Sequence, residues 1–280
     1  MKRIFCLLFI GSLAIPAFSQ FSGDTYASAK SNGKATWVLT YAEAPGFASK
    51  ENGQMKGITI DLMKRFKDYV EAKTSIDITM QVKANDPNNF TKFLNDVQTS
   101  KGGVFGLSNT TITNQRKQSF NFSPAYITNI GMVITHNSVA TVSSADGFAT
   151  SFKGMTAVTV KNSTNEQKIL SLKKQYLPEL KIEYVNSFSD ALDIVAKDPK
   201  KFADLDFTYY LSAVQAKKPV KRHPGGDETT EQFGIIMPKS NDWSGLLNDF
   251  MEEEFLNSVE YKKIISDNLG SSAMKYLEAL

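Results

Sequence analysis

One arginine stands at the start of a predicted helix, where a positive charge is unfavourable. Thr113 is of a type that caps helix N-termini, and Arg116 follows within the first turn. A cation there opposes the positive helix end, which costs roughly a few tenths of a kcal/mol, so an anionic partner is expected. Guanidinium grips both oxygens of a carboxylate through a planar fork that lysine lacks. Arg116 therefore indicates a carboxylate-binding residue, with an ordinary surface arginine as the alternative.

A second possible anion site is a helix N-terminus in the second half of the chain. Ser163 and Glu166 have the spacing of a capping box ahead of an apolar helical run. The hydroxyls of Ser163 and Thr164 lie beside backbone N–H groups that have no partner within the helix, which is a favourable setting for an anion. Helix capping explains the same residues without any ligand, so both interpretations stand.

Other chemistry has little support in the sequence. His136 and His223 are the only histidines, and neither has neighbours at metal-ligand spacing. No Gly-x-Ser-x-Gly nucleophile elbow occurs. We therefore expect no metal, no cofactor and no catalytic residue. A dehydratase needs only one acid or base with a suitable pKa, and the sequence does not exclude such a residue.

The elements that must position these residues alternate between strands and helices. In the first half, strands are predicted over 36–41, 75–82 and 104–107, and helices over 62–70 and 90–97, with another helical turn from 114. A second series has strands over 157–160 and 180–185 and helices over 165–176 and 189–196. Such alternation builds mostly parallel sheets covered by helices.

Three further segments complete this organisation. Residues 130–135 are extended and apolar, and we predict that they cross from one series to the other. Residues 233–238 are predicted to form one strand, followed by helices over 243–256 and 258–269, the second ended by Gly270. Residues 20–35, rich in Ser, Gly and Lys, are predicted to be a flexible lead-in.

The segment 106–126, GLSNTTITNQRKQSFNFSPAY, resembles a family signature. It is similar to the Thr-x-x-Arg and Phe-Ser-x-x-Tyr pattern of the periplasmic (extracellular) solute-binding proteins that serve polar amino acid ABC transporters, bacterial solute-binding protein family 3. Residues 57–62, 161–166 and 233–239 resemble further motifs of this family in the same order. One departure is Asn162, which stands where the family has a glycine. The resemblance covers most of 36–270.

The resemblance implies an α/β fold of the two-lobed type 2 periplasmic binding protein class. Each lobe would be a mixed, mostly parallel sheet flanked by helices, and two crossing strands would join the lobes around a solute-binding cleft. Lobe 1 would comprise residues 36–127 and 230–280, and lobe 2 residues 128–229.

The resemblance also implies roles for individual residues. Arg116 would hold the α-carboxylate of the ligand, Thr111 would help to bind its polar head group, and Thr164 would contact the same carboxylate from the second lobe. Asp206 aligns with the aspartate that pairs with the ligand's ammonium group. Asp204 is a rival because the spacing here is tighter than in the family. If neither acid reaches the cleft, a simple organic acid is a better candidate than an amino acid.

Four more residues complete the candidate site. Ser163 belongs to the helix N-terminus described above, and Asn109 is a candidate contact to the head group. Tyr41 and Phe47 are candidates for an aromatic face that packs against the solute. Packing in the core is the alternative for both aromatic residues.

The N-terminus indicates export. Lys2 and Arg3 precede an apolar run over 4–15 and a small-residue stretch ending at Ser19, so residues 1–19 are predicted to be a signal peptide. The run is too short to span the roughly 30 Å hydrocarbon core of a membrane. The single cysteine, Cys6, lies within this signal. We therefore predict a periplasmic protein with no disulfide.

The charge balance argues against a nucleic acid partner. The chain has 32 Lys+Arg and 29 Asp+Glu, and its basic cluster at 217–222 contains a proline and no aromatic residue. We predict a monomer that captures a solute with a carboxylate, an amino acid in the first place, and delivers it to an inner-membrane ABC permease. The alternatives are an enzyme on the same scaffold, such as a dehydratase, and a soluble sensor for a receptor.

Overall fold

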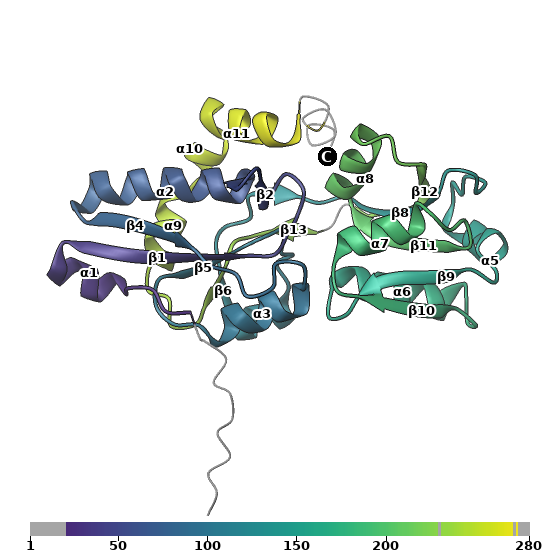
Figure 1. Cartoon of the computed structure of the whole chain (residues 1–280), viewed down its shortest axis with the longest axis horizontal. Coiled ribbons are helices and arrows are strands. Elements are labelled where there is room, and N and C mark those ends of the chain that lie inside the picture. The colour runs from purple at the N-terminus through teal and green to yellow at the C-terminus, as the bar shows by residue number, and fades with distance from the viewer. Residues whose placement is uncertain (1–20, 229–230, 271–272, 274–280) are drawn as a thin grey trace, which may run out of the picture.

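The structure is a computed structural model that describes residues 21–228, 231–270 and 273. The predicted signal peptide, residues 1–19, lies outside the described residues. Figure 1 shows the elements, which are α1 (Tyr26–Asn32), β1 (Lys34–Tyr41), β2 (Ser49–Glu51), β3 (Gln54–Lys56), α2 (Ile58–Thr74), β4 (Asp77–Val82), α3 (Phe90–Thr99), β5 (Val104–Leu107), α4 (Asn114–Ser119), β6 (Phe120–Phe122), β7 (Ile127–Thr128), β8 (Gly131–His136), η1 (Ala145–Gly147), α5 (Phe148–Ser151), β9 (Thr156–Val160), α6 (Thr164–Gln175), β10 (Lys181–Val185), α7 (Phe188–Val195), β11 (Lys201–Asp206), α8 (Phe207–Gln215), β12 (Val220–Glu228), β13 (Gln232–Phe233), β14 (Ile236–Pro238), α9 (Ser244–Phe250), α10 (Glu253–Leu256) and α11 (Val259–Leu269).

The molecule has two α/β lobes, which confirms the predicted fold class (Figure 1). The first sheet has the order β4-β1-β5-β14-β6, and the second has the order β10-β9-β11-β8-β12. In the first sheet β1 pairs in parallel with β4 and β5, while β14 is antiparallel to its neighbours. In the second, β9 is parallel to β10 and β11, while β8 is antiparallel to β11 and β12.

The chain passes between the lobes at β7 and β13, which pair with each other in an antiparallel manner. The prediction of a crossing strand over 130–135 is wrong, because β8 lies between β11 and β12 in the second sheet. Its apolar run reflects burial in the centre of that sheet. The strand predicted over 233–238 is interrupted at Gly234, so that β13 belongs to the crossing and β14 to the first sheet.

The segment predicted as a flexible lead-in is ordered and forms α1. Thr25 caps this helix through its side chain, which accepts a hydrogen bond from Ser28 N, and Asp242 accepts hydrogen bonds from the backbone N–H groups of Tyr26 and Ala27. The Tyr26 ring packs on Trp243 with 5.0 Å between centroids. Partners from the far end of the chain therefore fix a segment whose composition suggested flexibility.

Aromatic residues from distant segments form the core of the first lobe. The Trp37 ring lies 4.8 Å from Phe66, 5.2 Å from Phe105 and 5.1 Å from Trp243, and both tryptophans are fully buried. Since burying one large apolar side chain stabilises a fold by about 1.5–3 kcal/mol, this cluster ties the C-terminal segment to the first lobe. The helix predicted over 243–256 is broken into α9 and α10.

A buried histidine stabilises the core of the second lobe. The His223 Nδ1 atom accepts a hydrogen bond from Val142 N at 3.1 Å, so its Nε2–H donates to Thr135 Oγ1 at 2.7 Å. The ring also stands perpendicular to Phe152. Burial lowers the pKa of His223 to about 4, and the charge of Lys221 acts in the same direction. The neutral imidazole is thus part of the packing.

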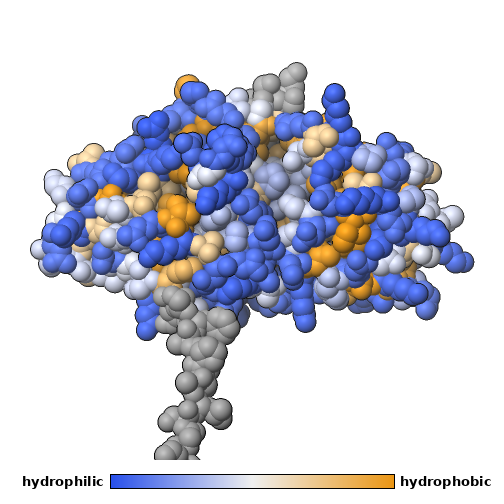
Figure 2. All heavy atoms as spheres, in the orientation of Figure 1, coloured by the Kyte–Doolittle hydropathy of each residue, from blue (hydrophilic) through white to orange (hydrophobic). Residues whose placement is uncertain are grey.

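The surface is largely hydrophilic on the face that Figure 2 shows, with apolar residues in separate patches. Within the part of the chain that the structure describes, no helix combines the length and the apolar character that a membrane span requires.

Candidate functional site

Arg116 lies on α4 with its guanidinium between the two lobes. The Thr113 Oγ1 atom accepts a hydrogen bond from Arg116 N at 3.1 Å, which confirms the predicted N-cap. The guanidinium donates from Nη1 to Thr111 O at 3.0 Å and from Nη2 to Asn162 O, in the second lobe, at 3.4 Å. The Arg116 Cζ atom is 5.6 Å from the centre of the Phe90 ring. These contacts fix the orientation of the Arg116 guanidinium plane.

The charge of Arg116 has no adjacent carboxylate among the described residues. The side chain is half-buried, and its hydrogen bonds go to backbone carbonyls alone. Burial lowers the pKa of Arg116 to about 10, while the negative charges of Glu231 and Asp206 raise it. Arg116 is therefore a cation at neutral pH whose unused N–H donors are available to an anion.

Two threonine hydroxyls face each other beside this arginine. Thr111 forms an isolated bridge with Phe233 of the crossing strand β13. Thr164 is the first residue of α6, and the Oγ1 atoms of Thr111 and Thr164 are 3.3 Å apart across the lobes. The first helical turn of α6 thus meets the loop that leads to Arg116, and an anion here would meet N–H and O–H donors from both lobes.

Ser163 serves the helix cap. Its Oγ accepts a hydrogen bond from Glu166 N at 3.0 Å and donates to Val160 O at 2.6 Å, while Glu166 accepts from Asn162 N at 2.8 Å. The Ser163 cap is confirmed, while the reciprocal bond of Glu166 goes to Asn162 N, one residue before the N-cap residue. Asn162 has a φ of 63°, a left-handed conformation that glycine adopts freely and asparagine tolerates. This conformation explains why asparagine can replace the family's glycine.

Asp206 is buried at the interface of the lobes. It ends β11, and its carboxylate accepts hydrogen bonds from Asn129 at 2.8 Å, from Asn165 at 3.4 Å and, across the lobes, from Asn109. Burial raises the pKa of Asp206 to about 7, and the charge of Glu231 adds to this effect, whereas the three amides oppose it.

Asp204, the rival, lies two residues earlier on the same face of β11 and is also buried. Its Oδ1 accepts a hydrogen bond from Asn165 at 3.1 Å, whereas its Oδ2 has no hydrogen-bond partner among the described residues. Burial raises the pKa of Asp204 to about 8, against the nearby charge of Lys168. Asp206 therefore contacts the first lobe, and Asp204 lies deeper in the second.

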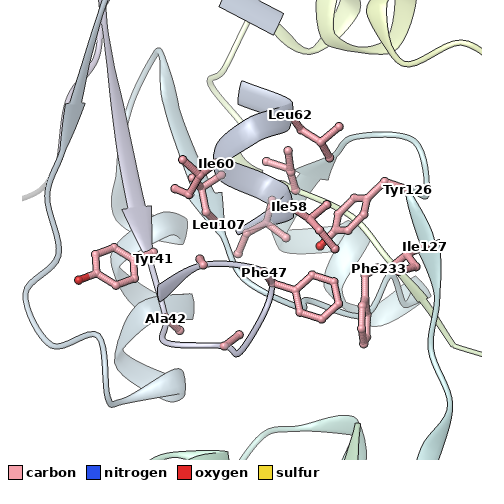
Figure 3. Close-up of a cluster of buried hydrophobic side chains, with 14 of the residues drawn as sticks. Tyr41, Ala42, Phe47, Ile58, Ile60, Leu62, Leu107, Tyr126, Ile127 and Phe233 are labelled. Atoms are coloured by element: carbon pink, nitrogen blue, oxygen red, sulfur yellow. The ribbon is translucent and has the colours of Figure 1, made fainter. Parts of the chain in front are cut away.

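The two aromatic candidates occupy different places in the first lobe. Phe47 is fully buried, 5.4 Å from the Phe233 ring and 6.2 Å from the Tyr126 ring, and Figure 3 shows it within this cluster. Tyr41 ends β1, and its ring points away from the same cluster (Figure 3). Phe47 therefore packs in the core next to the crossing strand and is not among the residues gathered at the lobe interface.

Three residues at the site were not found from the sequence. Asn129 and Glu231 lie on the two crossing segments, where Asn129 Nδ2 donates to Glu231 Oε2 at 2.9 Å, and Asn165 on α6 bonds to both aspartates. A single asparagine or glutamate beside a strand resembles any loop residue. Only the pairing of β7 with β13 brings the first two together.

The lobes are closed on each other in this structure. Besides the contacts of Arg116, Thr111 and Asn109, the Phe90 N–H donates to Asn186 O at 3.2 Å, and Thr91 Oγ1 donates to Lys161 O at 3.1 Å. The α3 N-terminus thus rests on the second lobe. A bound solute would be enclosed by both lobes.

Comparisons with known proteins agree with this architecture. The sequence model of the bacterial extracellular solute-binding proteins, family 3, matches residues 37–270. A search of curated proteins gives no match. Among solved structures, an ancestral arginine-binding protein bound to arginine has a TM-score of 0.68 and 21% identity, covering 84% of this chain and 98% of its own. The substrate-binding protein of an amino acid ABC transporter has a TM-score of 0.65, 18% identity and coverages of 83% and 98%. An ancestral amino acid-binding protein described as a precursor of cyclohexadienyl dehydratase has a TM-score of 0.61, 18% identity and coverages of 84% and 95%.

Proposed function

The chain belongs to the bacterial extracellular solute-binding proteins, family 3, and on this premise we propose that it captures a small solute with a carboxylate, in the first place an amino acid, between its lobes. The observation that carries the proposal is Arg116, a half-buried cation at the lobe interface without a carboxylate partner in the described chain. A buried charge is stable only when it is paired or well hydrogen-bonded. A ligand carboxylate would supply the missing partner.

The carboxylate would lie between Arg116 and the N-terminus of α6. The guanidinium would offer two parallel N–H donors, and Thr164 would offer its backbone N–H at the positive end of the helix dipole. Thr111 would donate its hydroxyl from the first lobe. Because these groups come from both lobes, the bound carboxylate would stabilise the closed form over an open one.

An ammonium group would be held by the carboxylate of Asp206. The Asn109 amide now occupies one acceptor position on Asp206, so a bound ammonium would compete with this amide. Ser163 would act through the helix cap, without a direct contact. This arrangement favours an α-amino acid over a plain organic acid, because the proposed anion site and the Asp206 side chain would bind the two charged groups of such a solute.

We further propose that the protein acts in the periplasm as a monomer and delivers its solute to an inner-membrane ABC permease. The family membership and the predicted signal peptide support this role. A dehydratase-like enzyme is the second candidate. Asp204 and Asp206 are buried carboxyls with raised pKa values. A carboxyl that acts as a general acid near neutral pH requires such a raised pKa.

The binding proposal is tested by thermal unfolding and calorimetry with a panel of amino acids and organic acids. A bound solute at a hundredfold excess over its Kd should stabilise the protein by about 2.7 kcal/mol. Arg116→Ala should abolish this gain, and Arg116→Lys should retain a small part of it. Lys117→Ala, which removes a neighbouring exposed cation, should behave as the parent. Equal affinity of Arg116→Ala and the parent would refute the site.

The enzyme candidate is tested with the solute that binds. Incubation of that solute with the protein, followed by mass spectrometry, should show unchanged solute if the protein only binds. Sustained product formation that Asp206→Asn abolishes would establish the enzyme instead.

A further inference from the structure

A cavity lies in the second lobe next to the predicted carboxylate site. Its volume is about 280 Å³, far above the roughly 10–15 Å³ that a cavity needs to hold one water. Four residues at helical spacing on α6 form one wall, and β8, β11, β12 and the crossing segment form the others. The lining residues are Gly131, Thr164, Gln167, Lys168, Ser171, Asp204, Glu228 and Glu231.

Asp204 gives this cavity its chemistry. The residue is 4% exposed, and its Oδ2 is buried without a hydrogen-bond partner among the described residues. An acceptor in that position costs about 1–3 kcal/mol when nothing bonds to it. Glu231 also lines the cavity, and Lys168, the one cation in the lining, forms an ion pair with Glu228. The cavity therefore offers a free carboxylate oxygen in acidic surroundings.

Asp206 is less suited to receive a second cation. Its two oxygen atoms already accept N–H groups from three asparagine amides. The neighbouring Asp204 accepts one amide hydrogen bond, from Asn165. A carboxylate has about four lone-pair positions, so Asp204 retains the greater capacity for a new donor.

The cavity also lies within reach of the carboxylate site. Thr164 lines the cavity, and its Oγ1 is 3.3 Å from Thr111 Oγ1 at the lobe interface. One residue at the start of α6 thus borders both places. A solute anchored by its carboxylate at Arg116 and Thr164 could direct a cationic group past Thr164 towards Asp204.

We propose that this cavity is a subsite for a cationic nitrogen group of the solute, an ammonium or a guanidinium, which donates hydrogen bonds to Asp204. The proposal rests on the proposed function for the way in which the rest of the solute is held. It assigns the preference for cationic solutes to the second lobe, at Asp204, whose hydrogen bond comes from Asn165 of the same lobe.

Binding of a cation to this subsite releases a proton near neutral pH. The pKa of Asp204 is raised to about 8, chiefly by burial and in smaller part by Asp206 and Glu231, while Lys168 and Asn165 oppose the rise. A cation at Oδ2 stabilises the ionised form. Affinity for a cationic solute should therefore increase with pH as Asp204 ionises, with proton release measurable by calorimetry in two buffers of different ionisation enthalpy.

The test compares arginine, its uncharged isostere citrulline, and agmatine, which has no carboxylate. Asp204→Asn removes the charge and relieves a buried carboxyl, so it should fold. Gly131→Ala keeps the charge of Asp204. The added methyl group would lie 3.8 Å from Asp204 Oδ1 and 3.9 Å from Oδ2 without a clash, and it would cover the carboxylate. Glu183→Gln, at an acid of the same lobe that pairs with Lys201, is the matched control.

Both variants should weaken arginine binding by about ten- to a hundredfold, and the control should leave it unchanged. If the two variants weaken the binding of arginine alone, the side-chain guanidinium lies at Asp204. If they weaken the binding of citrulline equally, the α-ammonium lies there. If arginine binds the parent and both variants equally, the subsite is refuted while the proposed function stands. If the parent binds agmatine in an Asp204-dependent manner but neither amino acid, the subsite stands and the proposed function fails.

Discussion

The side-chain amide of Asn109 donates a hydrogen bond to the carboxylate of Asp206, and this bond joins the first lobe to the second. A hydrogen bond to a charged group contributes about 1.5–3 kcal/mol. It therefore holds the lobes together when no solute is bound, at the position where an ammonium group would have to enter.

Asn109→Ala should shift the ligand-free protein towards an open form. Loss of the bond should change the ratio of closed to open molecules by about tenfold or more. Small-angle X-ray scattering should show a larger radius of gyration for ligand-free Asn109→Ala than for the parent. Asn32→Ala, which removes an amide that bonds to Ser28 within the first lobe, should not change it. An unchanged radius in Asn109→Ala would show that this bond does not hold the lobes.

The buried aspartates should make the ligand-free protein less stable as pH rises. The folded-state pKa values, about 8 for Asp204 and about 7 for Asp206, exceed the value of 3.8 expected for the unfolded chain. The folded state thus binds more protons between about pH 4 and pH 8, and the free energy of unfolding falls across this window.

Asp204→Asn should flatten this pH dependence. The variant should be more stable than the parent near pH 8 by an amount on the order of 5 kcal/mol, and the difference should vanish near pH 4. Denaturant unfolding at several pH values measures it. A parent and variant with parallel curves would contradict the burial of an ionisable carboxyl at this position.

His223 should produce the opposite trend on the acid side. Its pKa of about 4 in the folded state is below the 6.5 of a free imidazole, so the unfolded chain binds more protons between these values. The contribution of His223 to the free energy of unfolding should therefore fall as pH drops from about 6.5 to about 4, by roughly 3 kcal/mol, and it opposes the contribution of the two aspartates in this range. His223→Gln retains a donor for Thr135 and an acceptor for Val142 and should lack this contribution, so the stability difference between parent and variant should change with pH. His136→Gln controls for the removal of an imidazole elsewhere, and a parent and His223→Gln variant whose stabilities change with pH in parallel would exclude His223 as a source of the pH dependence.

The stability of the protein should depend on which residue adopts the left-handed conformation of Asn162. Its left-handed backbone disfavours a side chain with a Cβ atom, so Asn162→Ala should destabilise the protein by about 1 kcal/mol. Asn162→Gly should remain within roughly 0.5 kcal/mol of the parent, because glycine adopts this conformation freely. Equal denaturation midpoints for the alanine and glycine variants would contradict this interpretation.

The features that were predictable from the sequence are those encoded within a few residues. The caps at Thr113 and Ser163 are formed by side chains that reach only three positions ahead, and their chemistry is visible in a short segment. The position of Arg116 at the start of a helix followed directly from the first cap. The two-lobed fold was indicated by motifs in a fixed order.

The features that were not predictable depend on distant partners. Helix α1 is fixed by Asp242 and Trp243, more than two hundred positions away. Strand β8 was misplaced because a buried central strand and a crossing strand are both apolar. Asp204 and Asp206 have similar local sequence, and they differ in the amides of Asn109 and Asn129, which bond to Asp206.

The location of the two tryptophans determines how the protein can be observed in solution. Trp37 and Trp243, the only tryptophans of the chain, pack against each other in the core of the first lobe. Intrinsic fluorescence will therefore report the melting of that core, and movement between the lobes requires a dye attached elsewhere. A cysteine at the half-exposed Tyr184 would serve for labelling, since Cys6 is the only natural thiol and lies in the predicted signal peptide.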